Sequence, residues 1–355
     1  LRYTRKHDYR IANTFVLCLM FLFLGFSSWI MLPIRANADT IINENDPSDA
    51  RSLLAYYNRE QYPGVDSPVY GAYYSSMFAP NGEEVDDKPK YEKDEKLGKY
   101  IIVNHYENAI PGPNPKHVGL LPRMWSEQNA ENYIKYFDPL EFKIKGEYQS
   151  NEDLLNAVNQ FRDGYTKGDI GAGQYIKFLR EFSDYIEVEP PTVWQNVKYM
   201  FQFQFGYMYW RYFMWNFVGK QDDLQGKYDD HGNLLRGVNF VENMRFGSQE
   251  NLTRDILDNK GRNTYFFLPL ILGIVGLLFQ IKKDPKQFWA LLVFFLFTGI
   301  AIQFYTNPGI FQPRERDYSL VGSFYVFSLW IGMGVYGLFD EFKKLISPKI
   351  LAPAI

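Results

Sequence analysis

Cysteine and histidine are scarce in this sequence. Its 355 residues include one cysteine, Cys18, which lies in an apolar run, and four histidines that lack the spacing of metal ligands. A single cysteine excludes an internal disulfide bond and a cysteine-based zinc site. A thiol among apolar side chains is also a poor nucleophile, because such surroundings disfavour the thiolate. We therefore expect no metal site and no cofactor.

An excess of charge is also missing. The formal net charge is -3, whereas proteins that coat nucleic acid carry a strongly basic surface. We therefore expect no nucleic-acid partner. The sequence also contains no P-loop, no glycine-rich dinucleotide motif and no serine nucleophile elbow, so these three classes of enzyme are not indicated.

Aromatic residues, by contrast, make up 18% of the chain and gather near the ends of long apolar runs. A helix that crosses a bilayer needs about 20 mostly apolar residues, and Trp and Tyr favour its two interfaces. The sequence therefore predicts about four transmembrane helices. They are residues 14–32, 265–281, 288–305 and 321–339.

Basic residues predict the orientation of these spans, because cytoplasmic loops are enriched in Lys and Arg. They precede the first span, separate the second from the third and follow the fourth. We expect these three segments in the cytoplasm, and residues 35–264 on the outer side.

The first apolar run has a second interpretation as a signal peptide, because Ala36-Asn37-Ala38 resembles a cleavage site. The run is longer than a typical signal core and Arg35 follows it at once, which favours a membrane helix. The chain begins with Leu1 rather than Met, so we expect either a processed start or a piece of a longer chain.

Residues 35–193 are predicted to form a small mixed α/β domain. Residues 43–59 indicate a helix capped by Asp46 or Ser48, and a capping-box pattern at residues 150–153 opens another. Ile176, Leu179, Phe182 and Ile186 indicate one more helix, ended by the prolines at 190–191. Strands are predicted at residues 100–106 and 142–148, and residues 80–99 as a charged, solvated excursion.

Residues 194–218 are the most aromatic stretch. Alternating aromatic residues suggest a strand, and overall apolarity suggests a fifth span, but polar side chains such as Lys198 and Arg211 weaken the latter. We interpret the stretch as a helix at the outer interface. Its rings either serve packing or form a platform for sugar or lipid with Arg211 facing the site.

A short loop between the last two spans contains Arg314, Glu315, Arg316 and Asp317. One interpretation is a self-neutralised hairpin whose ion pairs hold two helices together. The other is that the two guanidinium groups bind an anion such as a lipid phosphate. Spacing alone leaves both open.

Five stretches together resemble one known family: residues 43–64, 121–126, 207–221, 262–277 and 312–335. They are similar to a family of bacterial polytopic membrane proteins, DUF2723, which is grouped with the GT-C glycosyltransferases of the protein O-mannosyltransferase type. The resemblance implies a mainly α, GT-C-like membrane protein in the bacterial inner membrane, with its large loop in the periplasm. It also implies transfer of a sugar from a polyprenyl-phosphate donor to Ser or Thr hydroxyls of a protein acceptor.

Within that resemblance, Arg314 and Arg316 are the candidates for binding the donor phosphate, supported by Glu315, Asp317 and Tyr318. The second-rank candidates are Arg123, Trp125, Arg211, Trp215 and Asn216. The family's catalytic acid lies in a part that would precede Leu1, so the catalytic residue is unknown and this piece alone is expected to be inactive.

An alternative function needs no catalysis: a membrane scaffold or export-machinery component whose outer domain binds a partner. A transporter fits poorly, because the predicted spans are nearly uncharged. The expected organisation is a first span in residues 1–34, the α/β region in 35–193, an aromatic interfacial helix in 194–220, a polar connector in 221–263, three spans in 264–345 and a cytoplasmic tail in 346–355.

Overall fold

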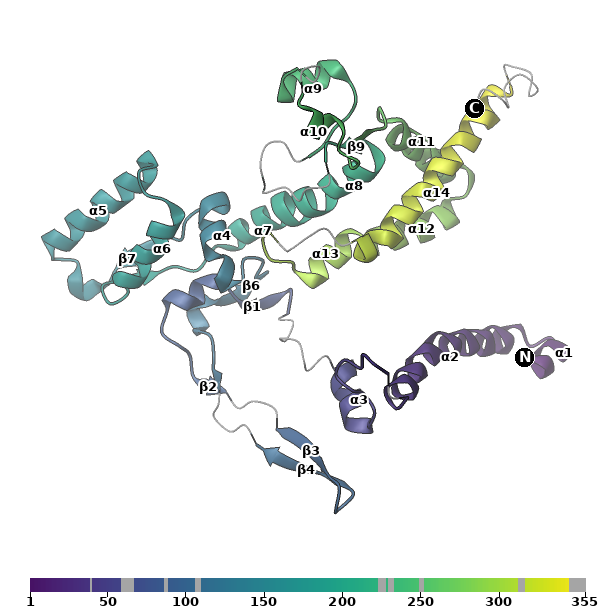
Figure 1. The fold of residues 1–355 in the computed structure, drawn as a ribbon, viewed down its shortest axis with the longest axis horizontal. Helices are drawn as coiled ribbons and strands as arrows, with labels where there is room; N and C mark the ends of the chain where they lie inside the picture. The colour runs from purple at the N-terminus through teal and green to yellow at the C-terminus, as the bar shows by residue number, and fades with distance from the viewer. Residues whose placement is uncertain are drawn as a thin grey trace. The chain divides into compact units, whose positions relative to one another are not determined.

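The computed structural model describes residues 1–38, 40–58, 67–85, 89–105, 110–222, 228, 233–248, 252–311 and 317–344. Most elements are helices, and the strands form two-stranded sheets (Figure 1). The chain divides into two compact units. The first comprises Leu1–Asp66 and Val85–Ile110, and the second comprises Ser67–Glu84 and Pro111–Ile355.

The first unit contains a long apolar helix. Its helices are α1 (Arg2–Lys6), α2 (Arg10–Ala36) and α3 (Ala50–Tyr57). Helix α2 is 27 residues long, and no residue of its most apolar 18-residue segment is buried inside the protein. Its length and composition suffice to cross a membrane, as predicted for the first span.

Helix α3 and a β-hairpin are joined through one carboxylate. The Asp49 side chain caps α3, with Oδ1 accepting from the backbone N–H groups of Arg51 (2.7 Å) and Ser52 (3.0 Å). The prediction that Asp46 or Ser48 caps this helix is therefore wrong, since Asp49 is the residue with extended backbone just before it. The Tyr100 hydroxyl also donates to Asp49 Oδ1 at 2.6 Å, and this bond lowers the pKa of Asp49 to about 2. Tyr100 belongs to β4 (Lys99–Asn104), the predicted strand, which pairs antiparallel with β3 (Lys90–Asp94).

The second unit begins with an α/β region. Strand β1 (Tyr70–Ala72) pairs with β6 (Val118–Leu120), and β7 (Phe142–Ile144) pairs with β8 (Ile186–Val188), both antiparallel. The helices α4 (Ala130–Phe137), α5 (Glu152–Lys167) and α6 (Ala172–Glu181) pack with β7 and β8 around a common core. The 3₁₀ turns η1 (Tyr74–Phe78), η2 (Pro115–His117), η3 (Glu127–Asn129) and η4 (Gly146–Tyr148) complete the region. The short strands β2 (Glu84–Val85) and β5 (Ile110–Pro111) lie where the chain passes from one unit to the other.

Two boundaries in this region differ from the sequence prediction. Helix α6 ends at Glu181, so Ile186 is a strand residue rather than part of the same helical face. Ile186 is buried in β8, and it would also be buried as the next residue of the predicted helical face. The apolar pattern therefore did not distinguish a helix from a strand at this position. The second predicted strand also stops at Ile144 and is followed by η4.

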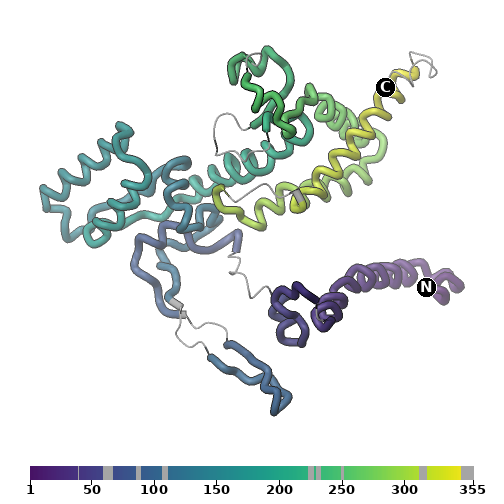
Figure 2. The backbone as a smooth tube through the Cα atoms, in the orientation of Figure 1, coloured from purple at the N-terminus to yellow at the C-terminus, as the bar shows by residue number. Residues whose placement is uncertain are grey.

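The aromatic stretch is one continuous helical path, as predicted (Figure 2). It runs through α7 (Val193–Tyr199), the π-helix η5 (Met200–Trp210) and α8 (Arg211–Phe217). Its first half packs in the α/β core through Tyr199 and Phe203. Its second half packs on the apolar helices, where Phe213 lies 4.7 Å from Phe327 between ring centres. We call this path the aromatic helix.

After the aromatic helix the chain forms a polar arm and then the apolar helices. The arm includes β9 (Gly219–Lys220), α9 (Asn239–Phe246), α10 (Arg254–Leu257) and β10 (Asn263–Thr264), and β9 pairs with β10. The apolar helices are α11 (Leu268–Lys283), α12 (Pro285–Phe297), α13 (Ile300–Thr306) and α14 (Asp317–Phe342).

Three helices, not four, are long and apolar enough to cross a membrane among the described residues: Arg10–Ala36, Pro285–Thr306 and Tyr318–Phe342. The predicted span at 265–281 is the one that differs, because α11 has only 16 residues and begins after a bend with positive φ at Phe266 and Phe267. The span Pro285–Thr306 consists of α12 and α13, separated at Gly299.

Helices α11 and α14 pack without side chains at their closest approach. A Cβ atom on Gly276 would lie 1.7 Å from the carbonyl oxygen of Trp330, and one on Gly334 would lie 2.0 Å from that of Leu272. The Trp330 Nε1 donates to Gln280 Oε1 at 2.7 Å inside this contact. At the far end, Asp340 pairs with both Lys283 and Lys343.

We expect Gly276→Ala to destabilise the protein by about 1–3 kcal/mol, because the added methyl group must push the two helices apart. A matched control is Gly332→Ala on α14, where a Cβ atom meets nothing within 4 Å. This change is expected to stabilise by about 0.5–1 kcal/mol, since alanine favours a helix over glycine. Thermal unfolding in detergent measures both, and equal effects would contradict the close contact.

Candidate functional site

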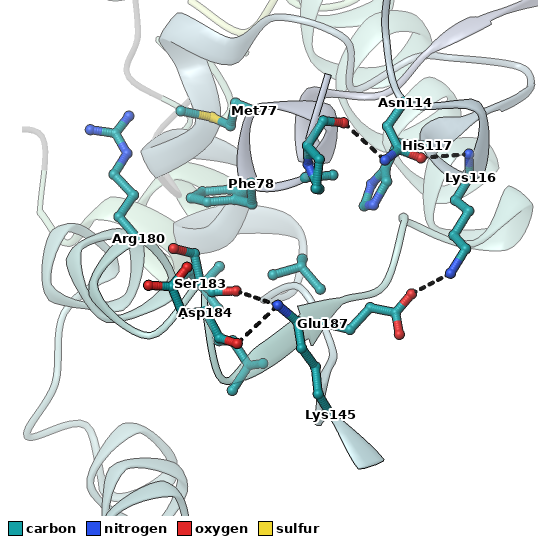
Figure 3. Close-up of a pocket in the computed structure, with 15 residues that line it drawn as sticks. Met77, Phe78, Asn114, Lys116, His117, Lys145, Arg180, Ser183, Asp184 and Glu187 are labelled. Carbon is teal, nitrogen blue, oxygen red and sulfur yellow. Dashed lines mark hydrogen bonds and ion pairs between the residues drawn. The ribbon is translucent and has the colours of Figure 1, made fainter. Parts of the chain in front are cut away.

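A hollow of 620 Å³ lies on the α/β region, lined by charged side chains from separate elements (Figure 3). Lys116 and His117 come from η2, Lys145 follows β7, Arg180 lies in the last turn of α6 and Glu187 lies in β8. Met77, Phe78 and Pro80 form an apolar wall. The hollow therefore presents positively charged, negatively charged and apolar side chains to a ligand.

A second hollow of 690 Å³ adjoins the first. Lys116, His117, Glu187 and Val188 line both hollows. The Lys116 Nζ donates to Glu187 Oε1 at 2.6 Å, and this bond lowers the pKa of Glu187. The ion pair thus lines both hollows, which we together call the two-lobed groove.

Lys145 is oriented by backbone atoms. Its Nζ donates to the carbonyl oxygens of Ser183 and Asp184, each at 3.0 Å, where the chain turns from α6 into β8 (Figure 3). The two carbonyls carry no formal charge, whereas the Glu187 carboxylate in the same hollow is near enough for the Lys145 charge to help lower its pKa. Lys145 therefore adds positive charge to a hollow that also contains a carboxylate.

His117 lies beneath the groove and is almost fully buried. Its Nδ1 is 2.7 Å from the hydroxyl oxygen of Ser75, which is completely buried. Burial lowers the pKa of His117, because the charged imidazolium loses solvation. Since Ser75 lines neither hollow, its hydroxyl has no access to a substrate there, and the pair anchors η1 to η2.

Arg123 is a second buried polar centre and has 0% exposure. Its guanidinium donates to the carbonyl oxygens of Phe304 (2.7 Å) and Pro68 (2.8 Å) and to Asn307 Oδ1 (3.4 Å). The Phe304 ring lies beneath it, with Cζ 3.9 Å from the ring centre. Among the described residues Arg123 makes no ion pair with a carboxylate, and burial lowers its pKa to about 10.

Asn307 completes this centre from the end of α13. Its Nδ2 donates to the Pro122 carbonyl at 2.9 Å, and its own carbonyl accepts from Trp125 Nε1 at 3.0 Å. Its Oδ1 also accepts from Gln204 Nε2 at 2.8 Å. We call Arg123, Asn307 and Gln204 with these partners the polar hub. It joins the α/β region, the aromatic helix and α13.

The remaining predicted site residues lie in different places. Arg314, Glu315 and Arg316 fall outside the described residues, and helix α14 begins at Asp317. Tyr318 is 71% exposed. The described part of the chain therefore does not test the predicted phosphate-binding site in the last loop.

Arg211 and Trp215 lie together on α8. The guanidinium carbon of Arg211 is 4.0 Å from the centre of the Tyr207 ring and 4.4 Å from that of Trp215. Asn216 donates to the Tyr212 carbonyl at 2.8 Å in the same helix. Thus Arg123 and Trp125 belong to the polar hub, whereas Arg211 and Trp215 form a separate stack.

The groove residues Lys116, His117, Lys145 and Glu187 were missed by the sequence analysis. They come from three places, η2, the end of β7 and β8, up to 71 residues apart, and the Lys116–Glu187 contact spans that whole separation. No local spacing marks such a set. Only the alternating strand pattern at residues 142–148 lies near it.

A family of unknown function, DUF8416, matches residues 64–201 of the chain. No match was found among curated proteins or among solved structures. The matched residues include the groove and the beginning of the aromatic helix, α7 and the first two residues of η5. The resemblance to the DUF2723 membrane family is therefore wrong, because the matching family is a different one without an assigned function. The GT-C-like fold and the sugar-transfer activity were inferred from that resemblance.

The groove histidine gives a pH prediction. Because the pKa of His117 is lowered on folding, its contribution to stability is present above the unfolded value of about 6.5 and is lost as pH falls toward the folded value. We expect the free energy of unfolding to decrease below about pH 6.5. His117→Gln is expected to remove this part of the decrease, whereas the exposed His7→Gln leaves it intact. Thermal melts at several pH values check it, and parallel profiles would contradict it.

The polar hub gives a second prediction. Arg123→Met leaves the carbonyl oxygens of Phe304 and Pro68 without their donor, so we expect a loss of about 2–4 kcal/mol. Arg123→Lys retains the charge but not the planar fork and is expected to recover less than half of the loss. Chemical unfolding in detergent measures both, with the exposed Arg254→Met as control. If Arg123→Lys were as stable as the wild type, the positive charge alone would account for the stability and the planar fork would not be needed.

Proposed function

We propose that this protein is a membrane protein whose α/β region binds an extended segment of a partner protein in the two-lobed groove. Three helices of sufficient length and apolarity support the membrane placement. Helix α2 exposes large apolar side chains, such as Phe23 (67%) and Leu24 (65%). Exposure of these side chains is unfavourable in water, whereas a lipid bilayer would cover them.

The groove itself carries the proposal of partner binding. Two adjoining hollows of 620 and 690 Å³ suit an elongated ligand better than a single small molecule. The groove presents charges of both signs beside the apolar wall of Met77, Phe78 and Pro80. A polypeptide carries the same mixture of charged and apolar groups. Such a segment places side chains on either side of the Lys116–Glu187 pair.

The polar hub supports a function in which the groove is held at a membrane. It fixes the loop at residues 121–126 to the C-terminal end of α13, which belongs to the candidate span Pro285–Thr306. A partner bound in the groove would thereby be held at a defined place relative to the bilayer. This is the role of a scaffold or export-machinery component.

Sugar transfer from a polyprenyl-phosphate donor stays a prediction. It rested on the family resemblance that the DUF8416 match corrects, and the two arginines expected to bind the donor phosphate lie outside the described residues. Location in a bacterial inner membrane, with the large loop in the periplasm, likewise stays a prediction.

The test places a photo-crosslinking residue at Ala79, which lines the first hollow, and at Asp153 on α5 as a control. The protein is expressed in its own host and should remain in membranes washed with sodium carbonate. We expect a discrete partner adduct from position 79 and none from position 153. Release from the membrane by carbonate would overturn the membrane part, and identical adducts would overturn the groove.

A charge exchange separates recognition from folding. The double variant Lys116→Glu with Glu187→Lys preserves the ion pair but exchanges the charges that the two lobes present. Exposed pairs contribute about 0–1 kcal/mol, so stability should change little. We expect crosslinking at position 79 to fall about tenfold, since like charges then face the partner. Undiminished crosslinking would show that these charges do not select the partner.

A further inference from the structure

A third hollow, of 420 Å³, lies between the aromatic helix and the polar arm. From the aromatic helix it is lined by Tyr207, Trp210 and Arg211, and from the arm by Leu234, Arg236 and Arg245. Three of the described lining residues are arginines and none is an acid. A hollow with this charge is suited to an anionic ligand.

Two of the three arginines are oriented by neighbouring groups. Arg211 is stacked between Tyr207 and Trp215, and its Nε donates to the Tyr207 carbonyl at 3.1 Å. Arg236 is fixed by Glu242, whose Oε1 accepts from the Arg236 backbone N–H and whose Oε2 lies 3.5 Å from Nη1. Arg245 lies in the last turn of α9. Guanidinium groups bind phosphate oxygens in pairs, so orientation of this kind favours a phosphate group.

The hollow is also close to one end of the candidate membrane helices. The Tyr209 hydroxyl oxygen lies 2.6 Å from that of Ser323, and the ring of Phe213 packs edge-on against that of Phe327. Ser323 and Phe327 both lie in the first half of Tyr318–Phe342. On the other side, the arm leads directly into α11 at Leu268. In a bilayer, this level of the helices lies near the lipid headgroups.

Exposed apolar side chains flank the arginines. Phe240 and Met244, one turn apart on α9, are 75% and 76% exposed, and Trp210 in the hollow is 51% exposed. A helix with such residues beside arginine is typical of one that lies in the membrane interface. The sequence analysis treated this arm as a polar connector, because its glycines and charges dominate the composition.

We infer that this hollow binds the phosphate-bearing headgroup of an anionic membrane lipid, with Phe240 and Met244 in contact with the acyl chains. Arg211, Arg236 and Arg245 bind the phosphate oxygens, and Trp210 covers the headgroup. The inference rests on the membrane placement proposed above but is independent of the groove and its partner.

The test uses the full chain, purified in a neutral detergent after confirmed recovery from carbonate-washed membranes. Short-chain phosphatidylglycerol, short-chain phosphatidylcholine and inorganic phosphate are titrated separately, and tryptophan fluorescence is recorded. We expect a saturable change with phosphatidylglycerol that is absent in Trp210→Phe. Arg245→Gln should weaken binding about tenfold, whereas Arg254→Gln on α10, outside the hollow, should bind as wild type.

Three outcomes would overturn the inference. A response of equal affinity to phosphatidylcholine would mean that anionic charge is not recognised. Saturation by inorganic phosphate without a response to lipid would identify a free-phosphate site instead. Binding unchanged by Arg245→Gln, with circular dichroism showing an intact fold, would place the lipid elsewhere. Because none of these titrations involves the groove, failure here leaves the partner-binding proposal standing.

Discussion

The second unit depends on the burial of one guanidinium group. Arg123 has given up its water without gaining a carboxylate among the described residues, which is costly unless its donors are satisfied. The compensation comes from the Phe304 carbonyl near the C-terminal end of α13, where a helix presents unpaired carbonyls and partial negative charge, and from the Pro68 carbonyl. The Arg123–Phe304 bond therefore serves both the buried cation and the helix terminus, while Nε of Arg123 has no hydrogen-bond partner among the described residues.

The arrangement around the hub follows from this requirement. Asn307 adopts a left-handed backbone, which ends α13 and turns the chain toward the α/β region. The Tyr199 hydroxyl then donates to the Pro308 carbonyl at 3.3 Å, and Ile310 enters the α/β core. Polar specificity and apolar burial are thus coupled at the same junction. A shift of α13 would break both.

Sequence reasoning found the elements that depend on local pattern. The long apolar runs became helices, the capping-box pattern opened α5, and the aromatic stretch became helical despite its alternating rings. It failed where the decisive contact is distant. Ile186 belongs to a strand because β7 lies opposite. Helix α11 begins only at Leu268, because Asn263–Thr264 pair with β9 and the Tyr265 N–H donates to the Val218 carbonyl. Neither β7 nor β9 is visible in a local window.

The candidate sites show the same division. Arg123 and Trp125 were selected from a short motif, but their role in the polar hub depends on Asn307, 184 residues away from Arg123. The groove combines side chains that no spacing connects. The hollow of Arg211 was anticipated only in part, since the arm that supplies Arg236 and Arg245 looked like a solvated linker. The composition predicted that the arm is polar, but only the structure shows that the arm lies beside α8.

The glycine contact between α11 and α14 has a mechanical consequence. Because backbone meets backbone at Gly276 and Gly334, no side chain separates the two helices at these positions. Sliding one helix along the other would bring larger side chains against the facing carbonyl oxygens. The pair is therefore fixed in register, and Asp340 of α14, paired with Lys283 of α11, holds the same register at the far end.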